Sequence, residues 1–269
     1  MRKRTTAIAV AGTLALTAVA LKAVTFGEPD GNRHPYVGTL LFETPSGLYS
    51  CSGTLLAPTV VLTAGHCTEE GGVSNLDTWV KFTPTITFPG IGGYPTVEDY
   101  LNDPANGWVH GTAIPHPLYD DFSRFPATYD IGVVILDTPV AMSTYGELPD
   151  ENFLRTIRTA AENRFTVVGY GMQGLVPPFY QDVWERYQGK VHLLELKSAL
   201  NAGMSAKFSN NPGIGGGSCF GDSGGPIFYD NTNIVVAVVS WGRTPCIGVD
   251  YQFRTDTALA LDFVRSYVP

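Results

Sequence analysis

The fold and chemistry of this chain are decided by one stretch, GDSGGP at residues 221–226. A serine hydroxyl is a poor nucleophile, and it needs exposure on a sharp turn and a base close by. The glycines beside Ser223 permit backbone conformations that larger side chains forbid. They also let backbone N–H groups point toward an incoming carbonyl oxygen. The alternative, a glycine-rich hairpin turn with a chance serine, is weakened by two further stretches of the chain.

A candidate base lies in the stretch TAGHC at residues 63–67. Histidine can take up and return a proton near neutral pH. The apolar run VVL at residues 60–62 predicts a strand that delivers His66 beside Cys67, which can fix the loop. A lone histidine is more often a hydrogen-bonded polar residue of the core. Here the strand and the cysteine favour a catalytic histidine.

An acid stands near the start of the apolar run YDIGVVIL at residues 129–136. The carboxylate of Asp130 would lie at the edge of the core, where an unpaired charge is costly. It therefore needs a partner, and an imidazole N–H is a suitable one. Taken alone, Asp130 fits a turn residue at the start of a strand equally well.

Composition indicates an all-β protein. The chain has 269 residues, of which 44% are hydrophobic, 30 are glycine and 19 are proline. That size allows one large core or two medium ones. Short apolar runs between turn residues predict strands. The predicted strands cover residues 36–42, 49–55, 60–63, 79–82, 131–136, 164–169, 188–196, 226–229 and 234–241.

Two other regions have a distinct character. Residues 256–268 predict a helix capped by Thr255 or Asp256, with an apolar face that packs on the body. Residues 83–112 are rich in Pro, Gly, Asn and Asp, which predicts a long surface loop or pair of loops. The net charge of −8 argues against nucleic acid as a partner, because phosphate binding requires a basic face.

The N-terminus is typical of an export signal. Residues 2–4 are basic, an apolar run extends from Ala7 to Leu21, and residues 18–20 offer small side chains for signal peptidase. A retained membrane anchor is the alternative, but a bilayer core requires about 20 apolar residues and Lys22 ends the run early. We expect residues 1–23 to be removed as a signal peptide, with or without a short propeptide, and the protein to be secreted.

The four cysteines of an exported chain predict two disulfides, with three possible pairings. Their spacings do not resemble a zinc site, since the chain has no CxxC and no HExxH. Carboxylates such as Glu69 and Glu70 offer a calcium site, although solvated surface charge is the better interpretation. We expect no metal and no cofactor.

In the order His, Asp, Ser, the three stretches resemble the trypsin/chymotrypsin-like serine proteases. Subtilisin-type and lipase-type enzymes have other orders. The segments HPLY (116–119) and CSGTLL (51–56) also match the family, and the resemblance extends from about Val24 to the C-terminal helix. It implies a peptidase domain over residues 24–269. That domain would hold two antiparallel six-stranded β-barrels, 24–140 and 141–255, and a C-terminal helix at 256–268.

The resemblance also implies a role for each site residue. Ser223 would be the nucleophile, His66 the general base and then acid, and Asp130 the group that holds the imidazole tautomer. The backbone N–H groups of Gly221 and Ser223 would form the oxyanion hole, and Ser240 would support Asp130. The segment Ser240-Trp241-Gly242 would pair with the substrate backbone as an added strand.

The same resemblance pairs Cys51 with Cys67, which would fix the histidine loop, and Cys219 with Cys246, which would join the walls of the specificity pocket. The pocket floor would lie at Gly217, followed by Ser218, and both are neutral. Gly242 would leave the pocket mouth open. We therefore predict cleavage after apolar or aromatic residues. Asp250, near the far wall, offers a displaced acid and hence an alternative preference for Lys or Arg.

Activation would follow from a new N-terminus. Val24-Thr25-Phe26-Gly27 resembles the segment that family members insert, although Phe26 departs from the usual pattern of two apolar and two small residues. The ammonium freed at Val24 would pair with buried Asp222 and order the oxyanion loop. Because Lys22-Ala23 fits no simple trypsin-type cut, we expect signal peptidase, with or without trimming, to expose Val24.

These inferences predict a secreted serine endopeptidase, a monomer that acts on polypeptide substrates and is open to proteinaceous inhibitors. We expect no nucleic acid partner and no stable membrane insertion. A protease-like binding protein without activity is one alternative, but such proteins usually lose one of the three residues. An esterase or lipase is another, but the GxSxG stretch of those enzymes is absent around Ser223.

Overall fold

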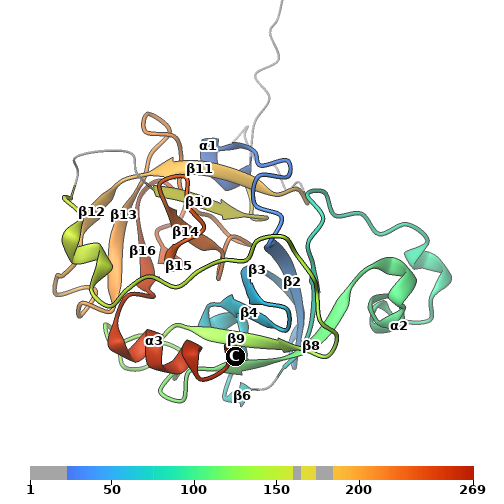
Figure 1. Cartoon of the computed structure of the whole chain (residues 1–269). Helices are drawn as coiled ribbons and strands as arrows, with labels where there is room; N and C mark the ends of the chain where they lie inside the picture. Colours follow the sequence, from blue (N-terminus) through green and yellow to red (C-terminus); the bar gives the residue numbers. More distant parts are fainter. Residues whose placement is uncertain (1–22, 75, 160–164, 174–183) are drawn as a thin grey trace, which may run out of the picture.

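The structure is a computed structural model that describes residues 23–74, 76–159, 165–173 and 184–269. Two β units lie side by side, and a helix near the C-terminus packs at their edge (Figure 1). The predicted fold class, all-β with a C-terminal helix, is confirmed. The predicted signal peptide lies outside the described residues, except for Ala23. Among the helices that the structure describes, none has the length and apolar character needed to cross a bilayer.

The first unit is a closed barrel with the strand order β2-β3-β4-β9-β8-β7. Its strands are β2 (Val37–Thr44), β3 (Gly47–Ala57), β4 (Val60–Thr63), β7 (Asp77–Lys81), β8 (Val109–Pro115) and β9 (Gly132–Leu136). Apolar side chains such as Leu40, Val61 and Val134 are fully buried inside it. Burial of this kind is worth about 1.5–3 kcal/mol for each large aliphatic side chain.

The register of β4 and β9 positions two of the predicted catalytic residues. These strands are antiparallel, and Thr63 lies opposite Gly132. His66 follows β4 in the turn η1 (Gly65–Cys67), and Asp130 comes just before β9. Because antiparallel neighbours end and begin at the same edge of a sheet, His66 and Asp130 arrive at one end of the barrel.

The second unit is a sheet of eight strands in the order β1-β11-β10-β14-β15-β16-β13-β12. Its strands are β1 (Glu28–Pro29), β10 (Phe165–Gly169), β11 (Tyr187–Val191), β12 (Leu193–Glu195), β13 (Ser205–Asn210), β14 (Pro226–Tyr229), β15 (Val235–Gly242) and β16 (Gly248–Arg254). The strand β12 continues β11 after His192, whose carbonyl accepts a hydrogen bond from Ser209 N at 2.9 Å. β11 and β12 are thus consecutive in the chain, although β11 lies near one end of the strand order and β12 at the other.

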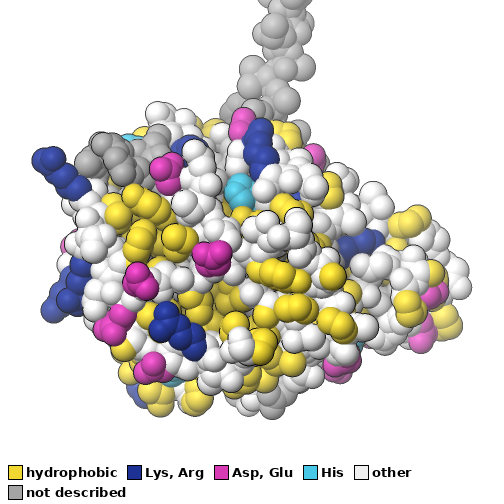
Figure 2. Space-filling view, in the orientation of Figure 1, with side chains coloured by type: hydrophobic (Ala, Val, Ile, Leu, Met, Phe, Trp, Pro, Cys, Tyr) yellow, Lys and Arg dark blue, Asp and Glu magenta, His cyan; other side chains and the backbone are white. Residues whose placement is uncertain are grey.

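The predicted loop over residues 83–112 is wrong at its C-terminal end, because β8 already begins at Val109. The rest of it includes η2 (Ile91–Gly93), the short helix α2 (Val97–Asn102) and η3 (Pro104–Asn106). This segment projects from the first barrel (Figure 1) and carries both hydrophobic and acidic side chains on its surface (Figure 2). At its base, the ring of Phe88 stacks on Trp108 with centroids 5.9 Å apart.

The C-terminal helix α3 spans Ala258–Arg265. Its cap is Thr257, whose Oγ1 accepts a hydrogen bond from Ala260 N, so the predicted caps at Thr255 and Asp256 are wrong. Asp256 instead accepts two hydrogen bonds from the guanidinium of Arg254. The remaining short elements are α1 (Ala23–Phe26), β5 (Glu69–Glu70), β6 (Val73–Ser74) and η4 (Phe153–Thr156).

Candidate active site

His66 and Asp130 are in direct contact. The carboxylate of Asp130 is fully buried, and its Oδ2 lies 3.0 Å from Nδ1 of His66. Oδ1 accepts a second hydrogen bond, at 2.8 Å, from the backbone N–H of His66. The hydroxyl of Ser240 donates a third, to Oδ2 at 2.5 Å. These contacts fix the ring orientation of His66 and favour a proton on Nδ1, which leaves Nε2 as the basic nitrogen.

The electrostatics of this pair follow from burial and mutual attraction. Burial alone would lower the pKa of His66, but the negative charge of Asp130 and its hydrogen bond raise that pKa above the ordinary value of 6.5. Burial would likewise raise the pKa of Asp130, but the charge and hydrogen bonds of His66, together with Ser240, hold it below its ordinary value. Asp130 is therefore ionised at neutral pH, and it stabilises an imidazolium at His66.

Ser223 sits on a turn that the two β units hold jointly. Ser52, on β3 of the first barrel, donates from its backbone N–H to the carbonyl of Ser223 at 2.7 Å. Its hydroxyl donates to the carbonyl of Gly221 at 2.9 Å and accepts from Tyr170 N at 3.0 Å. The loop of the second unit that carries Ser223 is thereby tied directly to a strand of the first.

Gly224 shows why glycine follows the serine. Its φ is +75°, and a Cβ at this position would lie 2.0 Å from Oγ1 of Thr63. Any side chain would therefore push the nucleophile loop off the first barrel. Gly221, at φ +93°, has a similar constraint, since a Cβ there would lie 2.9 Å from Cα of Gly171.

His66 and Ser223 line the same two cavities. One, of about 460 Å³, is also lined by aromatic residues such as Tyr49 and Trp184 and by the acidic residues Glu69, Glu70 and Asp121. The other, of about 380 Å³, includes Ser218, Ser240, Trp241, Gly242 and Asp250. A polypeptide laid across the site would place the two sides of its scissile bond toward these two cavities.

The predicted oxyanion donors are free of internal partners. Within the described part of the chain, the N–H groups of Gly221 and Ser223 donate no hydrogen bond, whereas those of Asp222, Gly224 and Gly225 do. Both residues also border the cavity that His66 lines. Two unpaired donors beside a serine can receive the negative oxygen of a tetrahedral intermediate.

Val24 and Asp222 are both fully buried, and the hydrogen bonds and ion pairs of the described residues include none between them. The carboxylate of Asp222 accepts hydrogen bonds from the N–H groups of Gly171 and Cys219, at 2.8 and 2.9 Å. Burial outweighs these bonds and raises the pKa of Asp222 to about 7. Val24 has φ 47°, a strained value for a β-branched residue.

The specificity pocket differs in one respect from the sequence prediction. Gly217 is buried but does not border the cavity, because it packs against Asn210, which would lie 2.2 Å from a Cβ at this position. Ser218 does line the cavity, and beside it lies Asp250. The Oδ2 atom of Asp250 accepts hydrogen bonds from Ser218 N, Ser218 Oγ and Asn210 Nδ2, at 3.0, 2.7 and 2.8 Å.

The predicted substrate strand lies along the edge of this cavity. Trp241 stacks on Tyr251, with ring centroids 3.9 Å apart, and Phe125 meets Trp241 edge to face at 5.3 Å. Gly242 pairs with Asp250 across β15 and β16. Trp241, packed against Phe125 and Tyr251, gives this cavity an apolar wall.

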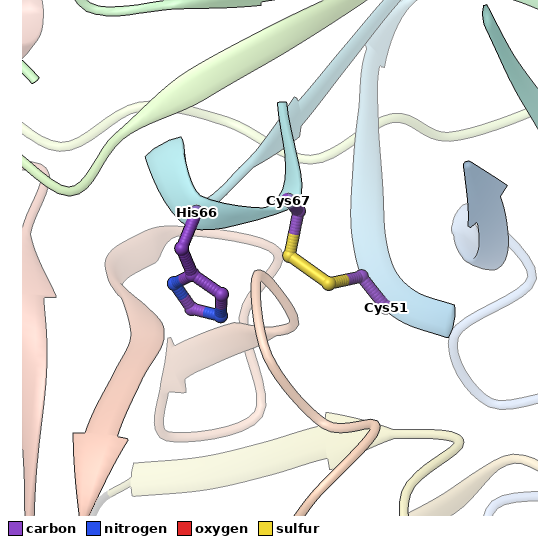
Figure 3. Close-up of side chains that lie close together, drawn as sticks. All are labelled: Cys51, His66 and Cys67. Atoms are coloured by element: carbon purple, nitrogen blue, oxygen red, sulfur yellow. A yellow bond between two sulfur atoms is a disulfide. The ribbon is translucent and has the colours of Figure 1, made fainter. Parts of the chain in front are cut away.

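The structure contains the disulfides Cys51–Cys67 and Cys219–Cys246, the pairs that the family resemblance implies. Figure 3 shows the first of them near the His66 ring, where it joins Cys67 on the turn of His66 to Cys51 on β3. Cys51, His66 and Cys67 form the one cluster of potential metal-binding side chains among the described residues. Because both sulfurs are already bonded to each other, the cluster offers no thiolate to a metal.

Several residues of the site were not predicted from the sequence. Ser52 and Asn210 hold the nucleophile loop and the pocket wall, and Gln252 donates to Ser218 Oγ at 3.0 Å. Asp250 and Gln252 are two residues apart on β16 and therefore point to the same face. That alternation of polar residues in an otherwise apolar strand is the signal that would have identified this wall.

Comparison with known proteins gives one family. The Trypsin family model matches residues 24–264. A trypsin of Saccharopolyspora erythraea is 28% identical over 231 residues, which cover 81% of this chain and 86% of the relative. A tryptase of Mus musculus is 26% identical over 258 residues, which cover 90% of this chain and 87% of the relative.

Solved structures share the fold. The structure of HL collagenase superposes with a TM-score of 0.67 at 18% identity, covering 91% of this chain and 98% of that one. Human heparin binding protein gives a TM-score of 0.60 at 18% identity, covering 91% and 96%. At these identities the likeness concerns the arrangement of the chain alone.

Proposed function

Since the chain belongs to the trypsin family of serine proteases, we propose that it is a secreted endopeptidase that cleaves peptide bonds through Ser223, His66 and Asp130. One observation carries this proposal. A fully buried Asp130 holds His66 by its backbone and its ring, and His66 shares two cavities with Ser223.

The proposed reaction begins when Nε2 of His66 takes the proton of Ser223 Oγ, which attacks the substrate carbonyl carbon. The carbonyl oxygen becomes an oxyanion that the N–H groups of Gly221 and Ser223 receive. When the intermediate collapses, the C–N bond breaks and His66 gives its proton to the departing amine. An acyl group remains on Ser223. Water then attacks this ester, with His66 again as base, and releases the carboxylic acid and the free serine.

Each part of the site would supply a different share of the rate. The two oxyanion donors stabilise charge that appears only in the transition state, and each is typically worth about 10²–10³ in rate. Asp130 stabilises the imidazolium that His66 becomes during both steps. Ser240 supports this role, because its hydroxyl donates to the same carboxylate.

Activation is proposed to follow a cut before Val24, by signal peptidase with or without trimming. The strained φ of Val24 and the buried Asp222, whose carboxylate has only backbone N–H partners among the described residues, support this proposal. A free ammonium at Val24 would give Asp222 an opposite charge. That pair would hold Gly221 and Ser223 in the conformation needed for oxyanion binding.

We base the proposed preference for the residue before the scissile bond on two features of one cavity. Ser218 and the glycine at 242 offer a neutral, open pocket, which supports cleavage after apolar or aromatic residues. Asp250 lines the same cavity and supports the alternative, cleavage after Lys or Arg. We further propose a monomer that acts on extracellular polypeptides and is open to proteinaceous inhibitors.

Labelling and profiling of the purified protein would test the function. A fluorophosphonate probe should label the mature protein at one site, and a peptide library should be cleaved within the chain. Ser223→Ala should lose both. The Ser143→Ala variant, at an exposed serine that lines neither of the two cavities, should keep both. Absence of labelling and cleavage by folded protein that begins at Val24 would instead indicate a protease-like binding protein.

A further inference from the structure

The pocket beside Ser223 contains a buried carboxyl group that has no cation for a partner. Asp250 is 2% exposed and lines the cavity of about 380 Å³. Among the described residues it forms no ion pair, and its hydrogen bonds come from a hydroxyl, an amide side chain and a backbone N–H. A buried charge with neutral partners alone is costly, so such a group either binds a cation or gives up its charge.

The two oxygens of Asp250 have different surroundings. Oδ2 receives all three of these hydrogen bonds, from Ser218 and Asn210. Oδ1 lies on the side of Gly242, 2.5 Å from where a Cβ would stand on that residue. Gly242 itself lines the cavity, and any larger residue there would cover Oδ1. One oxygen is thus fixed to the protein, and the other is left for the occupant of the pocket.

Charged groups on the neighbouring elements do not neutralise Asp250. On β13, Lys207 pairs with Glu195 and lies over the ring of Tyr251, 5.9 Å from its centroid. Arg243 follows β15 at the cavity mouth and is exposed. On the loop that carries Ser223, Asp222 is a second buried carboxyl group and supplies no positive charge, and the charge of Asp250 contributes to the raised pKa of Asp222. A cation that reaches Oδ1 must therefore come from the substrate.

We propose that Asp250 selects the substrate of this pocket by its own ionisation. When it is ionised, the pocket binds a lysine or arginine side chain, whose charge meets Oδ1. When it is protonated, the same pocket binds an uncharged apolar or aromatic side chain. The inference rests on the proposed function, because it assigns this cavity to the residue before the scissile bond.

The physical basis is the cost of removing water from the pocket. An apolar side chain would strip the solvent from an ionised Asp250 and offer nothing in return. A protonated Asp250 is a neutral hydrogen-bonding group, which an apolar occupant can cover at far lower cost. Burial raises the pKa of Asp250 to about 6, against the hydrogen bonds from Asn210 and Ser218. The change in preference should therefore fall between pH 5 and pH 7.5.

The test compares two peptide substrates that differ only in having Arg or Phe before the scissile bond. The ratio of their kcat/KM values, Arg over Phe, cancels the ionisation of His66, because both substrates need the same base. In the wild-type mature enzyme this ratio should rise roughly tenfold or more from pH 5 to pH 7.5, since one pKa unit is a factor of ten.

Two variants sharpen the test. Asp250→Asn can keep an acceptor toward Ser218 but has no charge, so its ratio should be low and independent of pH. Asp262→Asn, on the exposed face of α3, removes the same charge far from the pocket and should behave as wild type. If Asp250→Asn fails to fold, the pH dependence of the wild-type ratio still tests the proposal by itself.

The outcomes separate the two proposals. Cleavage of both peptides with a ratio that does not change with pH would overturn the role of Asp250 and leave the endopeptidase proposal in place. A low, pH-independent ratio in the wild type would do the same. Cleavage of neither peptide, with Ser223 unlabelled by fluorophosphonate, would overturn both.

Discussion

The Nε atom of Arg186 lies 2.9 Å from Oδ2 of Asp30, and both side chains are completely buried. The same guanidinium donates to the carbonyl of Val37 at 2.8 Å and to that of Gly31 at 2.8 Å. Arg186 directly precedes β11 of the second unit, and Val37 begins β2 of the first. One guanidinium therefore joins the N-terminal segment to both β units.

Replacing Arg186 by Met should destabilise the protein strongly. The change would leave the carboxylate of Asp30 buried with His34 as its remaining partner, and breaking a buried pair in this way costs about 3–5 kcal/mol. Urea unfolding with the disulfides intact would measure the loss. The double variant Asp30→Asn with Arg186→Met should recover part of it. A loss below about 1 kcal/mol in the single variant would show that water reaches Asp30.

The pKa of His66, which Asp130 raises, should determine the acid limb of the pH–rate profile. Only the neutral imidazole can accept the proton of Ser223, so kcat/KM should fall as pH drops through the pKa of His66, which Asp130 raises above 6.5. Asp130→Asn should move this limb to lower pH and reduce kcat roughly 10⁴-fold. Initial rates between pH 5 and pH 9 would check both effects, and an unmoved limb would contradict the role of Asp130.

Activity should also decline on the alkaline side. An α-amino group has a pKa of about 7.7–8.0, and a pair with Asp222 would raise that value, so the ammonium at Val24 should deprotonate at or above this range. N-terminal sequencing of the active protein should begin at Val24. Protein that retains residue 23 should be at least roughly tenfold less active. Full activity from a chain that begins elsewhere would contradict the activation proposal.

Removing the disulfide at the histidine loop should lower both stability and rate. The Cys51–Cys67 bond closes a loop with a sequence separation of 16, which corresponds to about 3 kcal/mol in the chain-entropy description. In the double variant Cys51→Ala with Cys67→Ala, kcat should also fall, because the bond fixes the residue next to His66. Thermal unfolding and initial rates would test this, with the Cys219–Cys246 bond left intact for comparison.

Stability should depend weakly on the charge of His110. Burial alone would lower the pKa of His110, but hydrogen bonds from its ring to Asp137 and Asp77 raise it. A raised folded-state pKa contributes stability that is complete below about pH 6.5 and is lost as pH rises through the folded value. Because both aspartates are exposed, the contribution should stay below about 1 kcal/mol. In Asp137→Asn the pH dependence of urea unfolding should shrink.

Much of the fold could be predicted because the site motifs and the apolar runs agree. The strands next to His66 and Asp130 are short and apolar, and turn residues bound them at both ends. Both features predict a strand. β13 and β16 were not predicted, because their buried faces are partly polar. In β16 the inward residues include Asp250 and Gln252, which a search for apolar alternation passes over.

The residues of the candidate site could be predicted where the proposed chemistry requires one residue type. They could not be predicted where only the folded structure determines which residues are in contact. No pattern in the sequence shows that Asn210 covers Gly217, or that β8 begins inside a segment rich in turn residues. Both depend on partners distant in the chain. His192, between β11 and β12, has no local signal either, because it is held by the backbone N–H and the side-chain hydroxyl of Ser209, which is distant in the chain.

The bonds made by Ser52 have a consequence for the whole architecture. Ser52 has no role in the proposed reaction, but its hydrogen bonds to the carbonyls of Gly221 and Ser223 fix that loop relative to the first barrel. The placement of Ser223 relative to His66 is thus fixed in the interior of the molecule, along β3. The outer part of the projecting segment, residues 89–99, has no fully buried side chain and can consequently change sequence without moving Ser223 relative to His66.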